Sequence, residues 1–547
     1  MAKLIYGVNT LKNLWCGGER INDKIISKSK YLAGLQYQKY LWYLFNAPDQ
    51  IPPYDEISLF RFKQGYEVAK LARSLFPDGI EVRYAVEGIE GIESMERGRS
   101  TGDVKHLESQ GSLGGIEEEL IATKKLILMK EKRPIFEAAF LYRNSFARAD
   151  VLEPAETDEW NIIEIKSATS IKDINKHDVA FQKYCYEGAG LRVNKCYIMY
   201  LNKDYKRSGQ IDPQALFLKR DVTEEVEVLK ENVEENIRIM LKFADLENSP
   251  EPPIGKNCYT PYECPLREFC WSFLPENNIF ELYRGKDLAC LFYQKGITSI
   301  CGINEEETSM LTPVQRLQYE SVKRKREFVD VPRLRCFFEK LRFPLYFLDF
   351  ETFATAIPLF DGLSPYQNVP FQFSCHVLES LDGEPQNFYF LADGKSDPRI
   401  DFLRSLKKTV TDTQGSIIVY YENFEKTILQ ELAIAFPQER LWIEDVISRI
   451  VDLYEPFGSF YYYHPRQKGS ASLKNVLPAL TGISYDEMEI KNGEEASLKY
   501  LTTTFLSDSH NLSGEDIEKI RKALLEYCDL DTRGMIYILR NLRKVVE

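Results

Sequence analysis

The sequence predicts a multidomain protein of the α/β class. A chain of 547 residues is too long for one hydrophobic core, so two or more domains are expected. Hydrophobic residues make up 44% and aromatic residues 13% of the sequence, which is typical of a folded protein. Strand-like runs alternate with segments of helical periodicity, and this favours sheets that pack against helices.

These patterns divide the chain into three segments. The first covers residues 1–275, and a helical, charged connector follows at residues 276–340. The third covers residues 341–547 and alternates strands with helices up to its end. One long helix is expected at residues 221–245, before a proline-rich break. Strands are expected at residues 135–140, 146–152 and 161–165 of the first segment and at residues 346–350, 371–377 and 416–420 of the third.

Composition also limits the functional classes. The sequence has no apolar run of 18 or more residues, and its first residues lack the regions of a signal peptide, so we expect a cytoplasmic protein without a membrane partner. The net charge of −13 has the wrong sign for a protein that coats nucleic acid indiscriminately. Any phosphate-binding surface must therefore be local.

Two carboxylates interrupt the apolar run FPLYFLDFETF. Asp349 and Glu351 lie two residues apart in an expected strand, so both side chains point to the same face. Burying two like charges without a partner costs on the order of several kcal/mol, so a positive charge is expected between them. A divalent ion such as Mg²⁺ is the simplest candidate. The alternative is an edge strand whose acidic face meets solvent.

Other acidic residues recur in the third segment. Glu425 lies in the first turn of an amphipathic helix that follows the buried run SIIVYY. Tyr527 and Asp531 are four residues apart in a predicted helix and hence share one face. Asn423, Asp452 and Asp529 lie nearby in the sequence and are interpreted as structural.

This ordered set resembles the DnaQ-like exonucleases of the RNase H fold, in the DEDD class that carries a tyrosine. The resemblance covers roughly residues 343–547. It implies that Asp349, Glu351, Glu425 and Asp531 bind two Mg²⁺ or Mn²⁺ ions and that Tyr527 orients the attacking water. The chain departs from the pattern at Glu425, where these enzymes usually have Asp.

The first segment has an acidic set of its own. Asp150 ends one expected strand, and Glu164 and Lys166 share a face of the next. Gln182 and Tyr186 lie one helical turn apart on the helix that follows. The set resembles the PD-(D/E)XK nucleases of the RecB type, which implies that Asp150 and Glu164 bind Mg²⁺ or Mn²⁺ and that Lys166 and Gln182 are catalytic. The alternative is an exposed Glu/Lys pair on a strand.

One expected metal ligand of this class is absent. RecB-type nucleases usually present a His from an early helix, four residues after a Gly. The run FKQGYEVAKLARS has Gly65 followed by Ala69 at that place. Glu137, in the strand before Asp150, does fit the order of the family. The first site is therefore expected to bind one metal ion weakly, or none.

Three cysteines cluster near the end of the first segment. Cys258, Cys264 and Cys270 are separated by five residues each time, and thiolates bind zinc or iron–sulfur clusters. Related RecB-type nucleases carry a [4Fe-4S] cluster with one upstream cysteine, but Tyr37 occupies that position here. Either Cys16 completes the cluster, or the cluster has been lost.

Nearly the full chain resembles a group of bacterial predicted RecB-family nucleases with a domain of unknown function. The resemblance implies a metal-dependent nuclease with two active centres, most simply a DNA exonuclease in DNA repair or mobile-element defence. One alternative is a nucleic-acid-binding scaffold with a degenerate first site and at most one active centre. The other is an RNA exonuclease, because the sequence does not reveal contacts to the 2′-hydroxyl.

Overall fold

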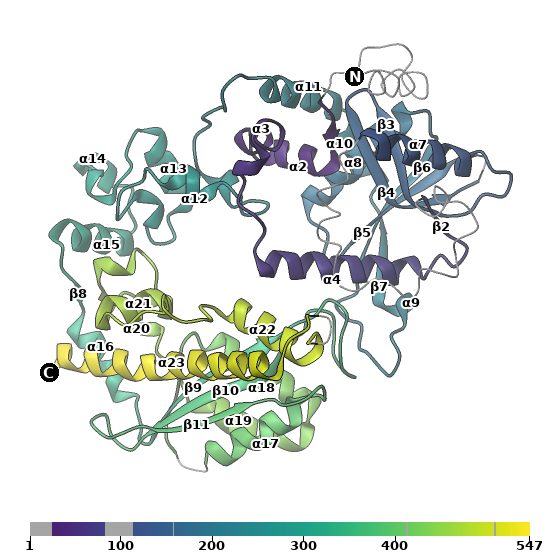
Figure 1. Cartoon of the computed structure of the whole chain (residues 1–547). Coiled ribbons are helices and arrows are strands. Elements are labelled where there is room, and N and C mark those ends of the chain that lie inside the picture. The colour runs from purple at the N-terminus through teal and green to yellow at the C-terminus, as the bar shows by residue number, and fades with distance from the viewer. Residues whose placement is uncertain (1–23, 83–112, 157, 412–413, 508–509) are drawn as a thin grey trace. The chain divides into compact units, whose positions relative to one another are not determined.

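The computed structural model describes residues 24–82, 113–156, 158–411, 414–507 and 510–547 (Figure 1). The chain separates into two compact units, and each contains both sheets and helices. The first unit comprises Met1–Cys270 and Thr355–Tyr366, and the second comprises Trp271–Ala354 and Gln367–Glu547. The predicted multidomain α/β class is therefore confirmed.

A seven-stranded mixed sheet forms the centre of the first unit. Six strands lie in the order β2-β3-β4-β5-β6-β7, and β1 pairs with β4. The pairs β2–β3, β5–β6 and β1–β4 are parallel, and the remaining neighbours are antiparallel. The strands span Ile26–Ser27 (β1), Ile80–Glu81 (β2), Ile135–Tyr142 (β3), Ser145–Pro154 (β4), Trp160–Lys166 (β5), Val193–Leu201 (β6) and Phe217–Asp221 (β7).

Helices surround this sheet in the described part of the first unit. Residues 221–245 are not one helix as expected, because a turn at Glu231 and Asn232 separates α10 from α11. Asn is a weak helix former, which is consistent with a break at that point. The helices span Lys28–Gln36 (α2), Gln38–Asn46 (α3), Glu56–Arg73 (α4), Leu113–Ile127 (α7), Asp173–Gly188 (α8), Pro213–Leu216 (α9), Thr223–Lys230 (α10), Val233–Ala244 (α11) and Arg267–Trp271 (α12).

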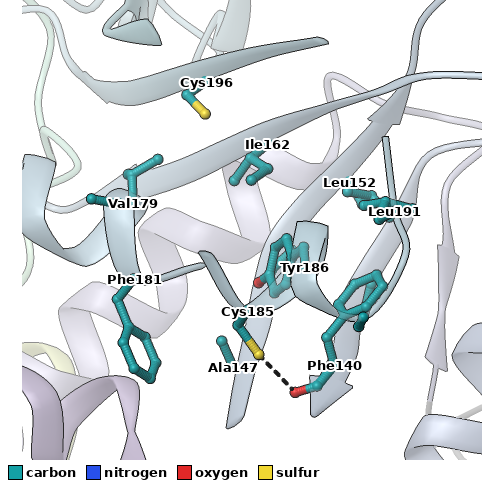
Figure 2. Packing of buried hydrophobic residues seen from close by; sticks show 14 of the residues in the cluster. Phe140, Ala147, Leu152, Ile162, Val179, Phe181, Cys185, Tyr186, Leu191 and Cys196 are labelled. Atoms are coloured by element: carbon teal, nitrogen blue, oxygen red, sulfur yellow. Dashed lines mark hydrogen bonds between the residues drawn. The ribbon is translucent and has the colours of Figure 1, made fainter. Parts of the chain in front are cut away.

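Helix α8 packs its apolar side onto the sheet of the first unit. Figure 2 shows Val179, Cys185 and Tyr186 of α8 among buried residues of neighbouring strands. The Cys185 thiol lies 3.4 Å from the carbonyl oxygen of Phe140 on β3. Because the core fixes α8 against β3, β4 and β6, the polar residues of the same helix are also held in fixed positions.

The segment Thr355–Tyr366 is part of the first unit, although it follows a strand of the second. Arg207 donates to the carbonyl oxygens of Pro358 and Leu359 at 2.8 and 2.7 Å. The Tyr366 hydroxyl lies 2.7 Å from the Ser167 hydroxyl, directly after β5. Polar contacts therefore fasten this segment to the sheet of the first unit.

A five-stranded mixed sheet forms the centre of the second unit. Its strands lie in the order β11-β10-β9-β12-β13, antiparallel from β11 to β9 and parallel from β9 to β13. A separate antiparallel pair joins β8 and β14. The strands span Phe328–Val329 (β8), Leu345–Phe353 (β9), Val369–Leu378 (β10), Gln386–Leu391 (β11), Ile417–Val419 (β12), Ile450–Asp452 (β13) and Tyr462–Tyr463 (β14).

The second unit also holds the longest helix of the described chain, α23 (Gly514–Val546). It begins at a capping box formed by Ser513 and Asp516 and packs against β9 and β10. No helix within the described residues has the length and apolar character needed to cross a membrane. The other helices span Lys286–Gln294 (α13), Glu305–Thr308 (α14), Pro313–Arg324 (α15), Val331–Glu339 (α16), Arg399–Thr409 (α17), Asn423–Ala435 (α18), Arg440–Ser448 (α19), Glu455–Gly458 (α20), Leu473–Thr481 (α21) and Gly493–Phe505 (α22).

The two faces of β9 differ in chemistry. Leu348 and Phe350 are buried in an apolar core with residues of α17, α18 and α19. Asp349 lies on the opposite face, where its carboxylate is 3.4 Å from the Cys528 thiol of α23. The alternation of the strand thus turns the acidic residues of β9 toward α23.

Candidate functional site

Three carboxylates of the second unit meet between β9 and α23. One oxygen each of Asp349, Glu351 and Asp531 lies within 4.8 Å of the other two. Within the described ranges, this is the group of three or more acidic, cysteine or histidine residues that could hold a metal ion. Glu351 and Asp531 are buried. Hard oxygen ligands at this spacing suit Mg²⁺ or Mn²⁺.

Glu425 approaches the group from α18. Its side chain is buried, and one carboxylate oxygen has no hydrogen-bond partner among the described residues. Burial raises the pKa of Glu425, and the charge of Asp349 raises it further. A buried carboxylate oxygen without a partner costs about 1–3 kcal/mol or more. A cation bound by the neighbouring carboxylates would offset that cost.

The electrostatics of the group favour a bound cation. Burial raises the pKa of Asp349 and of Glu351, and the neighbouring carboxylates raise both further. Burial also raises the pKa of Asp531 to about 6, although hydrogen bonds from Tyr485 and Tyr527 oppose the shift. A divalent ion would reverse this balance, because it stabilises the ionised form of each ligand.

Tyr527 lies beside the carboxylates, one helical turn before Asp531 on α23. Its side chain is buried, and burial raises the pKa of its hydroxyl far above the ordinary value. The nearby charge of Asp531 acts in the same direction. Tyr527 is therefore a neutral phenol at neutral pH and can donate a hydrogen bond.

Two further residues of this site are absent from the sequence-based prediction. The Tyr485 hydroxyl donates a hydrogen bond to Asp531. The Lys474 ammonium group, at the start of α21, lies over the rings of Tyr485 and Tyr527, at 5.4 and 5.2 Å from the ring centroids. Its charge opposes the upward pKa shifts of Asp349, Glu351 and Asp531. Lys474 thus partly balances the acidic group.

Two of the polar neighbours that were interpreted as structural make contacts of that kind. Asp452 accepts the backbone N–H groups of Tyr421 and Tyr454 at 2.8 and 2.9 Å, which shapes the turn after β12. Asp529 accepts a hydrogen bond from Asn387 at 2.5 Å. Neither belongs to the group of three close carboxylates.

The acidic set of the first unit is arranged differently. Glu164 and Lys166 of β5 meet Asp178 of α8, a residue that the sequence motifs did not single out. The Lys166 ammonium group lies 2.7 Å from Glu164 and 2.6 Å from Asp178. Lys28, the first residue of α2, approaches the same two carboxylates at 2.9 and 3.8 Å. Burial alone would raise the pKa of Glu164, but the two ammonium groups outweigh it and lower the pKa.

Gln182 and Asp150 complete this cluster. The Gln182 amide donates to Glu164 at 2.6 Å and to Asp178 at 3.1 Å, and its oxygen accepts from Tyr186 at 3.1 Å. Asp150 accepts the backbone N–H of Ile165 at 2.7 Å. Burial and the charge of Glu164 raise the pKa of Asp150 to about 7. The structure therefore brings the four predicted residues together, with two ammonium groups among them.

The position where RecB-type nucleases carry a histidine contributes no ligand here. Ala69 of α4 packs against an apolar cluster with Val68 and Ala72. Glu67 is exposed to solvent on another side of that helix. Glu137 of β3 pairs with Arg73.

Lys28 and Asp178 belong to no recognisable sequence motif, because a lysine at the start of a helix and an aspartate within a helix are common in any chain.

The three cysteines lie together around Tyr37. Cys258 and Cys264 are buried, and burial raises the pKa of the Cys264 thiol to about 11. All three thiols act on the Tyr37 phenol, whose pKa is raised first by burial and then by these neighbours. The Tyr37 hydroxyl donates to the carbonyl oxygen of Pro252 at 3.1 Å. The described residues thus offer three thiols with a phenol beside them, and the predicted ligand Cys16 lies outside them.

Comparisons with known proteins give limited matches. Residues 346–472 match the family model "Domain of unknown function (DUF2779)", a range that contains Asp349, Glu351 and Glu425. The "Uncharacterized protein MG366 homolog" of Mycoplasma pneumoniae is 26% identical over an alignment of 232 residues that covers 38% of this chain and 33% of that protein. The chain thus matches about one third of the length of this curated relative. Among solved structures, "Crystal structure of SSO0001" aligns with 40% of this chain and 98% of its own, at 17% identity and a TM-score of 0.16.

Proposed function

We propose that this protein is a metal-dependent nuclease whose active centre lies between β9 and α23. The observation that carries the proposal is the convergence of Asp349, Glu351 and Asp531, whose oxygens lie within 4.8 Å of one another. Glu425 is the fourth carboxylate. Four acidic groups would balance two divalent ions, and such an ion pair stabilises both the attacking and the leaving oxygen of a phosphodiester.

The arrangement of the second unit supports this proposal. The acidic pair lies on the central strand of a five-stranded mixed sheet; α23, which carries Asp531, packs against that strand, and α18, which carries Glu425, shares an apolar core with it. A strand with two acids, an acid in the helix after a buried strand and a helical Tyr/Asp pair are the features on which the resemblance to RNase H-fold exonucleases rests. The match of residues 346–472 to a domain of unknown function neither names nor opposes an activity.

The side chains around the acids have distinct proposed roles. Tyr527 is neutral and buried beside Asp531, so it can orient a water molecule for attack without adding charge. Tyr485 holds Asp531 in one orientation through its hydrogen bond. When metal ions neutralise the carboxylates, the positive charge of Lys474 is available to bind the substrate phosphate. We propose DNA as the substrate, cut from its ends, in DNA repair or mobile-element defence.

The experiment is a Mn²⁺-dependent digestion of end-labelled single-stranded and duplex DNA, with matching RNA substrates. Asp349→Asn and Glu351→Gln are expected to reduce cleavage by about a hundredfold or more, because metal stabilisation of the transition state is worth several kcal/mol. The matched control is Glu526→Gln, an exposed acid that lies beside Tyr527 on α23. Cleavage that survives both substitutions at the wild-type rate would refute the proposal, and cleavage of RNA alone would assign the other substrate.

We further propose that the three cysteines of the first unit bind an iron–sulfur cluster together with Cys16. All three thiols lie near enough to the Tyr37 phenol to raise its pKa, and three thiolates would supply three of the four ligands that a [4Fe-4S] cluster requires. Tyr37 lies where the related nucleases have their upstream cysteine. The iron and sulfide content of purified protein tests this part separately from nuclease activity.

A further inference from the structure

We infer that the acidic cluster of the first unit binds no divalent metal ion, because the Lys28 ammonium group takes the place of the cation. The RecB-type resemblance implies a metal ion at Asp150 and Glu164, and the contacts of these residues do not fit one. The inference deepens the proposed function, because it leaves the centre at Asp349 as the site of hydrolysis, and only this consequence rests on that proposal.

Lys28 is placed to neutralise the acids directly. It is the first residue of α2, where Ser27 caps the helix and fixes its direction. Its ammonium group lies 2.9 Å from Glu164 and 3.8 Å from Asp178, so it bridges β5 and α8. A divalent metal ion would have to share these oxygens with the ammonium group, and the two cations would repel each other.

The oxygens of both acids are already engaged. In Glu164, one oxygen accepts from Lys28 and Lys166, and the other accepts from Gln182 at 2.6 Å. In Asp178, one oxygen accepts from Lys166 and the other from Gln182. A metal ion would have to displace these donors, and each displaced donor would lose its partner in a buried site. Glu164 therefore offers no free oxygen in this arrangement.

The remaining ligand positions do not compensate. Asp150 directs one oxygen to the backbone N–H of Ile165 at 2.7 Å. Ala69 presents a methyl group where the related enzymes have a histidine. Among the described residues of the second unit, by contrast, Lys474 is the lysine that acts on the close carboxylates, and it lies over two aromatic rings. The two acidic clusters thus differ in the charge that surrounds them.

Mn²⁺ binding to the full chain tests the inference, by calorimetry and by electron paramagnetic resonance. The wild type is expected to bind Mn²⁺ at the second unit alone, so the double variant Asp349→Asn/Glu351→Gln should lose all bound Mn²⁺. Residual Mn²⁺ that disappears when Glu164→Gln is added would overturn the inference. This arm needs no change at Lys28, so it does not depend on the folding of a lysine variant.

A second arm removes the lysine. In the background of the double variant, Lys28→Ala is expected to gain one Mn²⁺ per chain, and Glu164→Gln should abolish that gain. The control is Lys30→Ala, since Lys30 lies on the same helix but places its ammonium group over the Phe45 ring, at 3.8 Å from the centroid. A folded Lys28→Ala variant that gains no Mn²⁺ contradicts the role of Lys28. Absence of Mn²⁺ from the wild type would instead refute the proposed nuclease centre. The Lys28→Ala variant would still test the role of Lys28 in that case, because it reports Mn²⁺ binding at the first unit.

Discussion

Substituting Glu351 by Gln should stabilise the metal-free protein and abolish its stabilisation by Mn²⁺. The oxygens of Asp349, Glu351 and Asp531 lie within 4.8 Å of one another. At that distance and an effective dielectric constant of about 20, two full charges repel by about 3 kcal/mol. The substitution removes two such pairs, but burial raises the pKa of Glu351, which weakens the repulsion, and Lys474 attracts Glu351. We therefore expect a gain of about 3 kcal/mol at pH 8 rather than the full sum.

The assay is urea unfolding in EDTA and in excess Mn²⁺, followed through the transition that responds to Mn²⁺ in the wild type. Ligand at about 100 times its dissociation constant should raise wild-type stability by about 2.7 kcal/mol. Glu351→Gln should lose that increment, whereas the exposed control Glu526→Gln should keep it. A Glu351→Gln protein that is destabilised in EDTA, or that still responds to Mn²⁺, would refute the charge-repulsion argument.

Three further predictions concern single groups. Burial raises the pKa of Glu281 to about 7, so the wild type loses stability as pH rises from about 4.5 to about 7. Compared with the wild type, Glu281→Gln should be more stable by about 2–3 kcal/mol at most at pH 8 and equally stable at pH 4, which pH-dependent unfolding measures. Lys474→Met removes a charge that opposes cation binding, so Mn²⁺ binding measured by calorimetry should tighten by roughly threefold to tenfold. Weaker binding by this variant would contradict the conclusion that the Lys474 charge acts on the carboxylates. Cys264→Ser should remove iron from protein purified without oxygen if the three thiols hold a cluster, and iron that is unaffected by this change would exclude them as ligands.

Local periodicity explains why part of the site could be predicted. The two-residue repeat of a strand places Asp349 and Glu351 on one face, and the helical repeat places Tyr527 and Asp531 on one face. Both relations involve neighbours in the sequence, so they are visible without a fold. The structure then shows that these two faces oppose each other.

The residues that prediction missed reach their sites through tertiary packing. Lys28 and Asp178 meet Glu164 from two helices that are far apart in the sequence, and no spacing rule connects them. Lys474 and Tyr485 likewise belong to none of the motifs recognised in the sequence. Their charges nevertheless decide how each acidic cluster behaves, because Lys28 contacts a carboxylate oxygen directly at 2.9 Å, whereas Lys474 acts on its carboxylates through its charge alone. Electrostatic balance is therefore the property of these sites that sequence motifs describe least well.

The assignment of Thr355–Tyr366 to the first unit affects how the protein can be divided for experiments. A fragment that stops at residue 270 would leave Arg207 without the carbonyl oxygens of Pro358 and Leu359. It would also uncover an apolar cluster in which Ala356 is buried. A fragment that begins near residue 341 would carry this segment away from the surface that it covers. Truncated halves should therefore aggregate more readily than the intact chain, and the shorter fragment should regain solubility when residues 355–366 are grafted onto it.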